Sequence, residues 1–156
     1  MKKNAQLRYF RPMMLLFIIL VMAAACTPKS ELDKAQEKWD AQKITHYRMK
    51  VRHMQSIWHL QTYEIEVTGG EILHSATCIP APSEGRTCEI EDYDPAEYTV
   101  DGLFETARWQ LESEYAEWVK IKYDAKYGYP ESILFDHPEI LDEDNFWAVL
   151  EFEQLP

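Results

Sequence analysis

This chain has no long hydrophobic run and few basic residues for its length. Its apolar stretch, residues 13–25, falls short of the roughly 20 residues that a membrane-spanning helix needs, which argues against a transmembrane anchor. Only 16 Lys and Arg stand against 27 Asp and Glu, so the formal net charge is −11. A surface of that sign repels phosphate, and nucleic acid is therefore excluded as a partner.

The motifs of several enzyme and metal-site classes are also absent. No Cys-x-x-Cys pair suggests redox chemistry, no serine lies in Gly-x-Ser-x-Gly, and none of the five histidines forms a His-x-x-x-His pair. These absences predict a protein without catalytic activity or cofactor. A Ser-His-Asp arrangement assembles in space rather than in sequence, so a periplasm-facing hydrolase stays open as an alternative.

The sequence does contain an N-terminal targeting signal. Four basic residues precede the apolar run, and the run ends in three alanines followed by Cys26, the pattern of a signal peptide. The ending resembles the lipobox of bacterial lipoproteins, which implies that Cys26 is acylated and becomes the mature N-terminus. Ordinary cleavage that leaves Cys26 free is the alternative. Because Thr27 replaces the aspartate of inner-membrane retention signals, we expect the outer membrane in a Gram-negative cell, and otherwise the extracytoplasmic side of the cell membrane.

The rest of the chain has the length of one domain. We divide the sequence into a lipoprotein signal peptide at 1–25, a short tether at 26–30 and a single domain at 31–156. No basic patch follows Cys26, so the acyl chains must provide the membrane anchor. At about 3.5 Å per residue the tether holds the domain close to the membrane.

The two remaining cysteines, Cys78 and Cys88, form an even pair in an oxidising compartment and predict a disulfide. Prolines and a glycine between them indicate a loop, and closing it stabilises the fold by about 2–3 kcal/mol. A cross-linked loop is also pre-organised for binding. This property supports a second alternative, an enzyme inhibitor that acts through the loop.

Hydrophobic periodicity predicts an α+β fold. The expected order is a helix, three antiparallel strands, a second helix and three more antiparallel strands, with the helices packed on the sheet. The expected elements are a helix at 31–44, strands at 47–55, 63–67 and 71–78, a helix capped by Thr99, and strands at 117–123, 131–136 and 146–152. A turn centred on Ser56 would pair Arg48 with Glu64, and a two-residue hairpin turn would pair Val67 with Ile72.

Several of these features occur together in a known family. The features are Trp39, the Cys78 and Cys88 pair, Tyr98-Thr99-Val100 with Leu103-Phe104, Tyr123, Tyr127-Gly128-Tyr129-Pro130, Asp136 and Asp142-Glu143. Together they resemble a family of small bacterial secreted proteins and lipoproteins, catalogued as a domain of unknown function, over nearly the whole mature chain. The family implies no activity, and the loop between the cysteines looks expanded relative to its members.

One group of candidate residues is acidic. Asp136, Asp142, Glu143 and Asp144 supply oxygen ligands of the kind that calcium prefers. Their spacing is not that of an EF-hand and the glycine of its turn is missing. We therefore predict a solvated loop between two strands and no metal site.

The other group of candidates is aromatic. Tyr127, Tyr129, Trp118 and Trp147 are candidates for a partner-binding patch, since aromatic residues anchor interfaces. Strand periodicity places Trp118 and Trp147 away from the inward side chains and groups Ala148 with Phe152 on one face. Packing beneath the first helix is the alternative role for the aromatic set.

Together these observations predict a membrane-anchored bacterial envelope lipoprotein without catalytic activity. We expect it to contact the membrane through its N-terminal lipid and to bind or support another envelope component. The sequence does not identify that component.

Overall fold

The computed structural model describes residues 29–56, 59–78, 90, 92–138 and 145–156. The chain divides into two compact units, Met1–Ser30 and Glu31–Pro156, and every described helix and strand belongs to the second. Among the described residues, no helix combines the length and apolar content needed to cross a membrane. The predictions for Cys26, for the loop that ends at Cys88 and for residues 142–144 fall outside the described residues.

The described part of the second unit is an α+β domain with two helices and a six-stranded antiparallel sheet, in the expected order of helix, three strands, helix and three strands. Two short 3-10 helices, η1 and η2, flank the second helix. The elements are α2 (Glu31–Gln42), β1 (His46–Ser56), β2 (His59–Thr68), β3 (Glu71–Cys78), η1 (Pro95–Tyr98), α3 (Val100–Glu112), η2 (Ala116–Trp118), β4 (Val119–Tyr123), β5 (Pro130–Phe135) and β6 (Asn145–Gln154).

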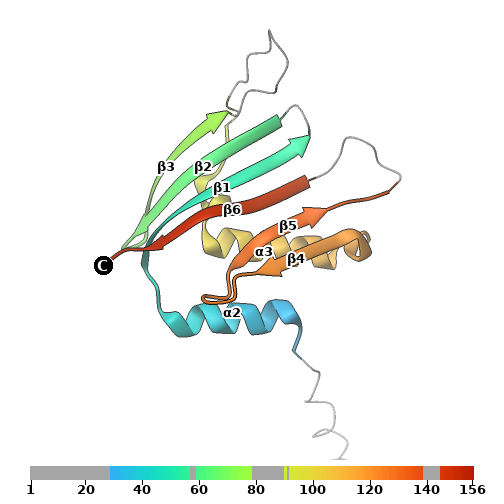
Figure 1. Ribbon diagram of the computed structural model, residues 1–156, viewed down its shortest axis with the longest axis horizontal. Helices are drawn as coiled ribbons and strands as arrows, with labels where there is room; N and C mark the ends of the chain where they lie inside the picture. The colour runs from blue at the N-terminus through green and yellow to red at the C-terminus, as the bar shows by residue number, and fades with distance from the viewer. Residues whose placement is uncertain (1–28, 57–58, 79–89, 91, 139–144) are drawn as a thin grey trace, which may run out of the picture. The chain divides into compact units, whose positions relative to one another are not determined.

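The sheet brings the first and last strands together at its centre. Its strand order is β3-β2-β1-β6-β5-β4, so the last strand lies beside the first (Figure 1). This arrangement leaves β3 and β4 as the two edge strands. Period-two alternation sends Tyr47, Met49 and Val51 of β1 into the core, while Arg48 and Lys50 lie on the opposite face.

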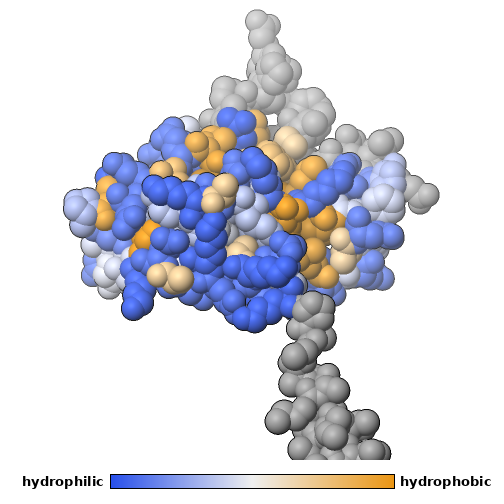
Figure 2. Space-filling model, turned by 60° about the horizontal axis from the view of Figure 1, so that its bottom comes forward, coloured by the Kyte–Doolittle hydropathy of each residue, from blue (hydrophilic) through white to orange (hydrophobic). Residues whose placement is uncertain are grey.

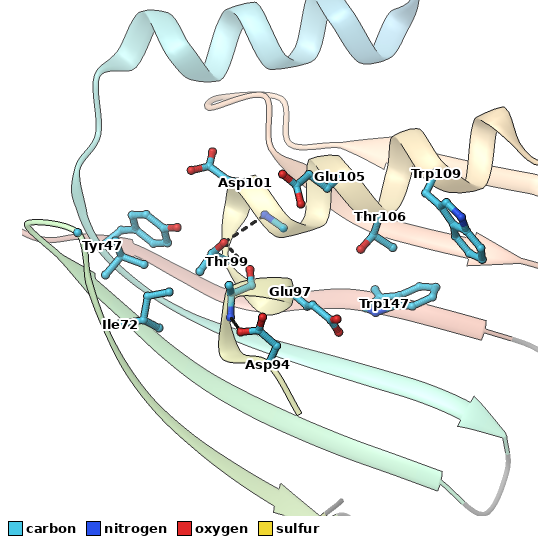
Figure 3. A pocket seen from close by; sticks show the side chains of 14 residues that line it. Tyr47, Ile72, Asp94, Glu97, Thr99, Asp101, Glu105, Thr106, Trp109 and Trp147 are labelled. Carbon is cyan, nitrogen blue, oxygen red and sulfur yellow. Dashed lines mark hydrogen bonds between the residues drawn. The ribbon is translucent and has the colours of Figure 1, made fainter. Parts of the chain in front are cut away.

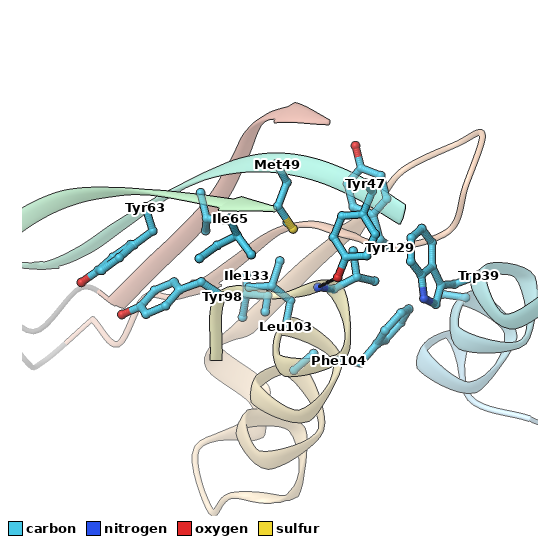
Figure 4. Packing of buried hydrophobic residues seen from close by; sticks show 14 of the residues in the cluster. Trp39, Tyr47, Met49, Tyr63, Ile65, Tyr98, Leu103, Phe104, Tyr129 and Ile133 are labelled. Atoms are coloured by element: carbon cyan, nitrogen blue, oxygen red, sulfur yellow. Dashed lines mark hydrogen bonds between the residues drawn. The ribbon is translucent and has the colours of Figure 1, made fainter. Parts of the chain in front are cut away.

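The core lies between the sheet and the two helices (Figure 4). Trp39 from α2 makes edge-to-face contacts with Tyr47 and Phe152, at ring-centroid distances of 5.7 and 5.8 Å. Leu103 and Phe104 from α3 are also buried in this core. Aromatic burial of this kind dominates the energetics of a small core.

The opposite face of the sheet carries paired charges. Arg48 bonds Glu66 at 2.7 Å, and Lys50 lies between Glu64 at 3.3 Å and Glu151 at 3.2 Å. Pairs in such exposed positions contribute about 0–1 kcal/mol each. Figure 2, which brings the underside of Figure 1 forward, shows a mostly hydrophilic surface interrupted by apolar residues.

The residue pairings predicted for two hairpins can be compared with the observed strand registers. Val67 pairs with Ile72, which confirms the hairpin prediction. The expected pairing of Arg48 with Glu64 is wrong, because Arg48 pairs with Glu66. The observed register differs from the expected one by two residues, and a shift of two keeps every side chain on its expected face.

The last strand departs from its expected pattern at a β-bulge. Leu150 is an extra residue between the partners of Lys50 and Val51. Because side chains alternate between the two faces of a strand, one extra residue moves all side chains before it to the face opposite the one that unbroken alternation predicts. Ala148 and Phe152, expected on one face, therefore lie on opposite faces.

Candidate functional site

The four aromatic candidates do not form one surface patch. Tyr129 is only 6% exposed, and its ring packs against Phe152 at 4.7 Å and Trp39 at 6.3 Å. Tyr127 stacks beside Tyr129, so this pair belongs to the aromatic packing around α2. For these two residues the structure favours the packing role over the binding role.

The two tryptophans lie elsewhere. Trp118 is in η2, before β4 begins, and contacts His137 with a centroid distance of 5.2 Å. The expected outward position of Trp147 is wrong, because the bulge turns it to the helix side, where it stacks on His53 at 4.3 Å. On this side Trp147 lines the groove beside α3 that is described below.

The acidic candidates give no metal site among the described residues. Asp136 accepts a hydrogen bond from Lys120 at 3.1 Å, and both side chains are exposed. No group of three or more potential metal ligands occurs in the described part of the chain. Asp142, Glu143 and Asp144 lie outside it.

A groove of about 730 Å³ lies between the β2–β3 hairpin, η1 and α3. In Figure 3, Tyr47 and Ile72 lie toward one end of the groove, and Trp109 and Trp147 lie toward the other. Its lining consists of Tyr47, Val67, Gly70, Ile72, Asp94, Ala96, Glu97, Thr99, Asp101, Gly102, Glu105, Thr106, Trp109 and Trp147. This volume lies within the range of about 300–1,000 Å³ that is typical of ligand sites.

The backbone around the groove is held by a helix cap. Thr99 begins α3: its side-chain oxygen accepts from Gly102 N–H at 3.1 Å and its hydroxyl donates to Ala96 carbonyl at 2.7 Å. The predicted Thr99 cap is therefore confirmed. The Tyr47 hydroxyl accepts from Val100 N–H at 3.1 Å, which ties α3 to β1. Burial raises the pKa of Tyr47 to about 12, so the hydroxyl stays neutral.

Four carboxylates line the groove, from Asp94, Glu97, Asp101 and Glu105. Lys, Arg and His are all absent from the described lining, and none of the ion pairs of the described chain involves these four groups. Burial raises the pKa of Asp101, and repulsion from Asp40 and then Glu105 adds to the effect. The groove therefore carries negative charge that the described residues do not compensate.

The spacing of these carboxylates in the sequence is a signal for this site, although it matches no catalytic or metal-binding motif. Asp101, Glu105 and Trp109 recur every four residues on α3, the spacing that aligns side chains along one helix face, and Glu97 precedes them by the same interval in η1. All four are exposed, and Trp109 is 69% exposed although tryptophan is a highly buried residue on average. Like charges four residues apart destabilise a helix slightly, so the alignment of Asp101 with Glu105 costs a little helix stability.

A second, smaller cavity of about 170 Å³ adjoins η1 on the side of the buried His53. His53 Nδ1 lies 2.9 Å from the Tyr98 hydroxyl and Nε2 lies 3.4 Å from the Asn145 amide oxygen. Burial lowers the pKa of His53 to about 4, and burial is also the main cause that raises the pKa of Tyr98. Tyr63 stacks on Tyr98 at 3.6 Å. These contacts satisfy buried polar groups with one another.

Comparison with known proteins identifies a family. A family model described as a family of unknown function (DUF6174) matches residues 31–154. The chain therefore belongs to this family, whose match covers all of the described helices and strands. Comparisons with curated proteins and with solved structures find no match.

Proposed function

We propose that this chain is a membrane-anchored bacterial envelope lipoprotein that carries out no catalysis and binds or supports another envelope component. The leader at 1–25 and Cys26 support the location, with the outer membrane as the site in a Gram-negative cell. The observation that carries the binding role is the groove beside α3, with its exposed Trp109 and its uncompensated carboxylates.

Two properties of the groove support binding rather than chemistry. Its described lining offers carboxylates, hydroxyls of threonine and tyrosine, and aromatic rings, but no histidine, lysine, serine or cysteine to pair as base and nucleophile. An exposed tryptophan beside a hollow is the kind of residue that anchors a protein partner. The interface would form on α3 and η1, which the cap at Thr99 holds in place.

A hydrolase is the second candidate, and the smaller cavity is the observation that favours it. His53 and Tyr98 form a hydrogen-bonded pair there, and both have shifted pKa values. Against this role, Tyr98 is 3% exposed and lies under the Tyr63 ring, so its oxygen is poorly placed to attack a substrate. A hydrolase of this kind would cleave a chromogenic ester and lose that activity in Tyr98→Phe.

Site-specific photo-crosslinking in producing cells tests the binding role. A photoreactive residue at Thr106 lies in the groove, and one at Glu114 lies beyond the end of α3 as the matched control. The proposal predicts a discrete crosslink to an envelope protein from position 106 that is absent from position 114. The same products from both positions, or none from position 106, would contradict it.

A further inference from the structure

We propose that the groove beside α3 binds an extended, Lys- and Arg-rich segment of a partner protein. This inference deepens the proposed function and rests on it, because it names the chemistry of the envelope partner. Three independent features of the groove carry it: its charge, its exposed aromatic ring and its edge strand.

The charge of the groove selects a cationic occupant. Elsewhere on the described domain the carboxylates of β2 and β6 have Arg48 or Lys50 within 4.0 Å. Asp101 and Glu105 in the groove have no such neighbour, although they lie one helical turn apart and repel each other. A lysine or arginine placed between them would remove this repulsion and form charge-assisted hydrogen bonds.

The aromatic ring provides a second contact for the same kind of group. Trp109 follows Glu105 by four residues on α3, one helical turn further along toward the Trp147 end of the groove (Figure 3). Tryptophan is the best aromatic partner for a guanidinium or ammonium group, and 69% of this side chain is exposed to receive one. At the other end, Val67 and Ile72 offer an apolar wall for the methylene stems of long cationic side chains.

The edge strand favours a protein segment over a small polyamine. Ile72, in the wall of the groove, belongs to β3, which pairs only with β2 in the described sheet. An edge strand presents unpaired backbone N–H and C=O groups that the backbone of an extended segment can bond. A polyamine carries positive charge but cannot form this backbone pairing.

Calorimetric titration of the full chain, purified in neutral detergent, tests the inference. The probe is a blocked peptide with the repeated sequence Gly-Lys-Gly-Arg, and spermine is titrated separately. The groove variant is Asp101→Asn with Glu105→Gln. Its control is Glu114→Gln with Glu117→Gln, which removes the same charge from exposed positions beyond α3.

We expect the peptide to bind the wild-type chain and the groove variant to weaken binding by about tenfold or more, since every tenfold corresponds to about 1.4 kcal/mol. The control should weaken it by less than about twofold, because remote exposed charges are screened at moderate salt. Trp109→Ala should also weaken peptide binding, and Trp109→Phe should restore part of it, with melting temperatures unchanged.

Three results would overturn the inference. The first is no peptide binding by the wild-type chain, and the second is equal weakening of peptide binding by the groove variant and its control. The third is spermine binding as tight as peptide binding, with the same loss of affinity in the groove variant. A specific crosslink from position 106 alongside any of these results would leave the proposed function standing and remove only the cationic partner.

Discussion

Gly102 is the residue on which the junction between α3 and η1 depends most directly. A Cβ built at this position would clash with the Ala96 carbonyl oxygen and would lie 2.7 Å from backbone atoms of Glu97. Both neighbours are backbone, so no side-chain rotation can relieve the contact. The same carbonyl accepts the Thr99 hydroxyl at 2.7 Å, and moving it away would strain the helix cap.

Gly102→Ala therefore has two opposing effects on the stability of the fold. Intrinsic helix propensity favours alanine over glycine by about 0.8–1.0 kcal/mol in a helix interior. Overpacking against fixed backbone costs about 1–3 kcal/mol or more, and here η1 must move by roughly 1 Å to restore a normal contact. The contact distances decide for the second effect, so we expect net destabilisation and a fall in melting temperature of roughly 5–10 °C.

Thermal unfolding followed by circular dichroism measures this effect. Thr106→Ala, on the same helix and only half-buried, is the matched control and should stay within about 0.5 kcal/mol of the wild type. Because η1 also carries Glu97, Gly102→Ala should weaken peptide binding in the groove as well. A Gly102→Ala chain that melts at or above the wild-type temperature would refute the close approach of α3 and η1.

Three further predictions concern the core, the buried histidine and the cysteines. Trp39→Ala should cost about 3–5 kcal/mol in urea unfolding, whereas Trp109→Ala should cost less than about 0.5 kcal/mol, and equal losses would contradict the burial of Trp39. Burial lowers the pKa of folded His53 to about 4 from 6.5, so the unfolded chain binds the extra proton and stability falls as the pH drops from about 6.5 toward 4. Between about pH 7.5 and pH 5, protonation of His53 in the unfolded chain should lower the free energy of unfolding by about 2 kcal/mol. If a His53→Gln chain kept the same pH dependence of stability, this role of His53 would be wrong. Non-reducing peptide mapping should join Cys78 to Cys88, with two free thiols as the contrary outcome, and loss of the bridge should cost about 2–3 kcal/mol.

Local patterns predicted most of the secondary structure. Alternation in β1 and β4 placed Tyr47, Met49 and Ile121 on the core side, where the structure has them. The Thr99 cap was recognisable because its hydroxyl precedes a strong apolar period. These features depend on neighbours in sequence, so the sequence alone contains the information.

The sheet order and the bulge in β6 could not be predicted in the same way. The pairing of β1 with β6 joins segments about a hundred residues apart, and no local signal specifies it. The bulge at Leu150 has no glycine or proline to mark it, and it reversed the expected facing of Trp147. Strand periodicity assumes an unbroken pleat, which fails wherever one residue is inserted.

The candidate site was the least predictable feature. The four-residue spacing of Glu97, Asp101, Glu105 and Trp109 is visible in the sequence, but an exposed helix face commonly looks the same. What makes it a groove is the β2–β3 hairpin on the other side, and that juxtaposition exists only in the folded sheet. Asp136, an acidic candidate of the sequence analysis, instead pairs with Lys120.

Intact-mass spectrometry of the chain extracted from the membranes of producing cells shows whether Cys26 anchors this domain to a membrane through a lipid. We predict a polypeptide that begins at Cys26 and carries the added mass of acyl chains, and a Cys26→Ser chain that is released or left unprocessed. An unmodified Cys26 in the wild-type product would contradict this prediction.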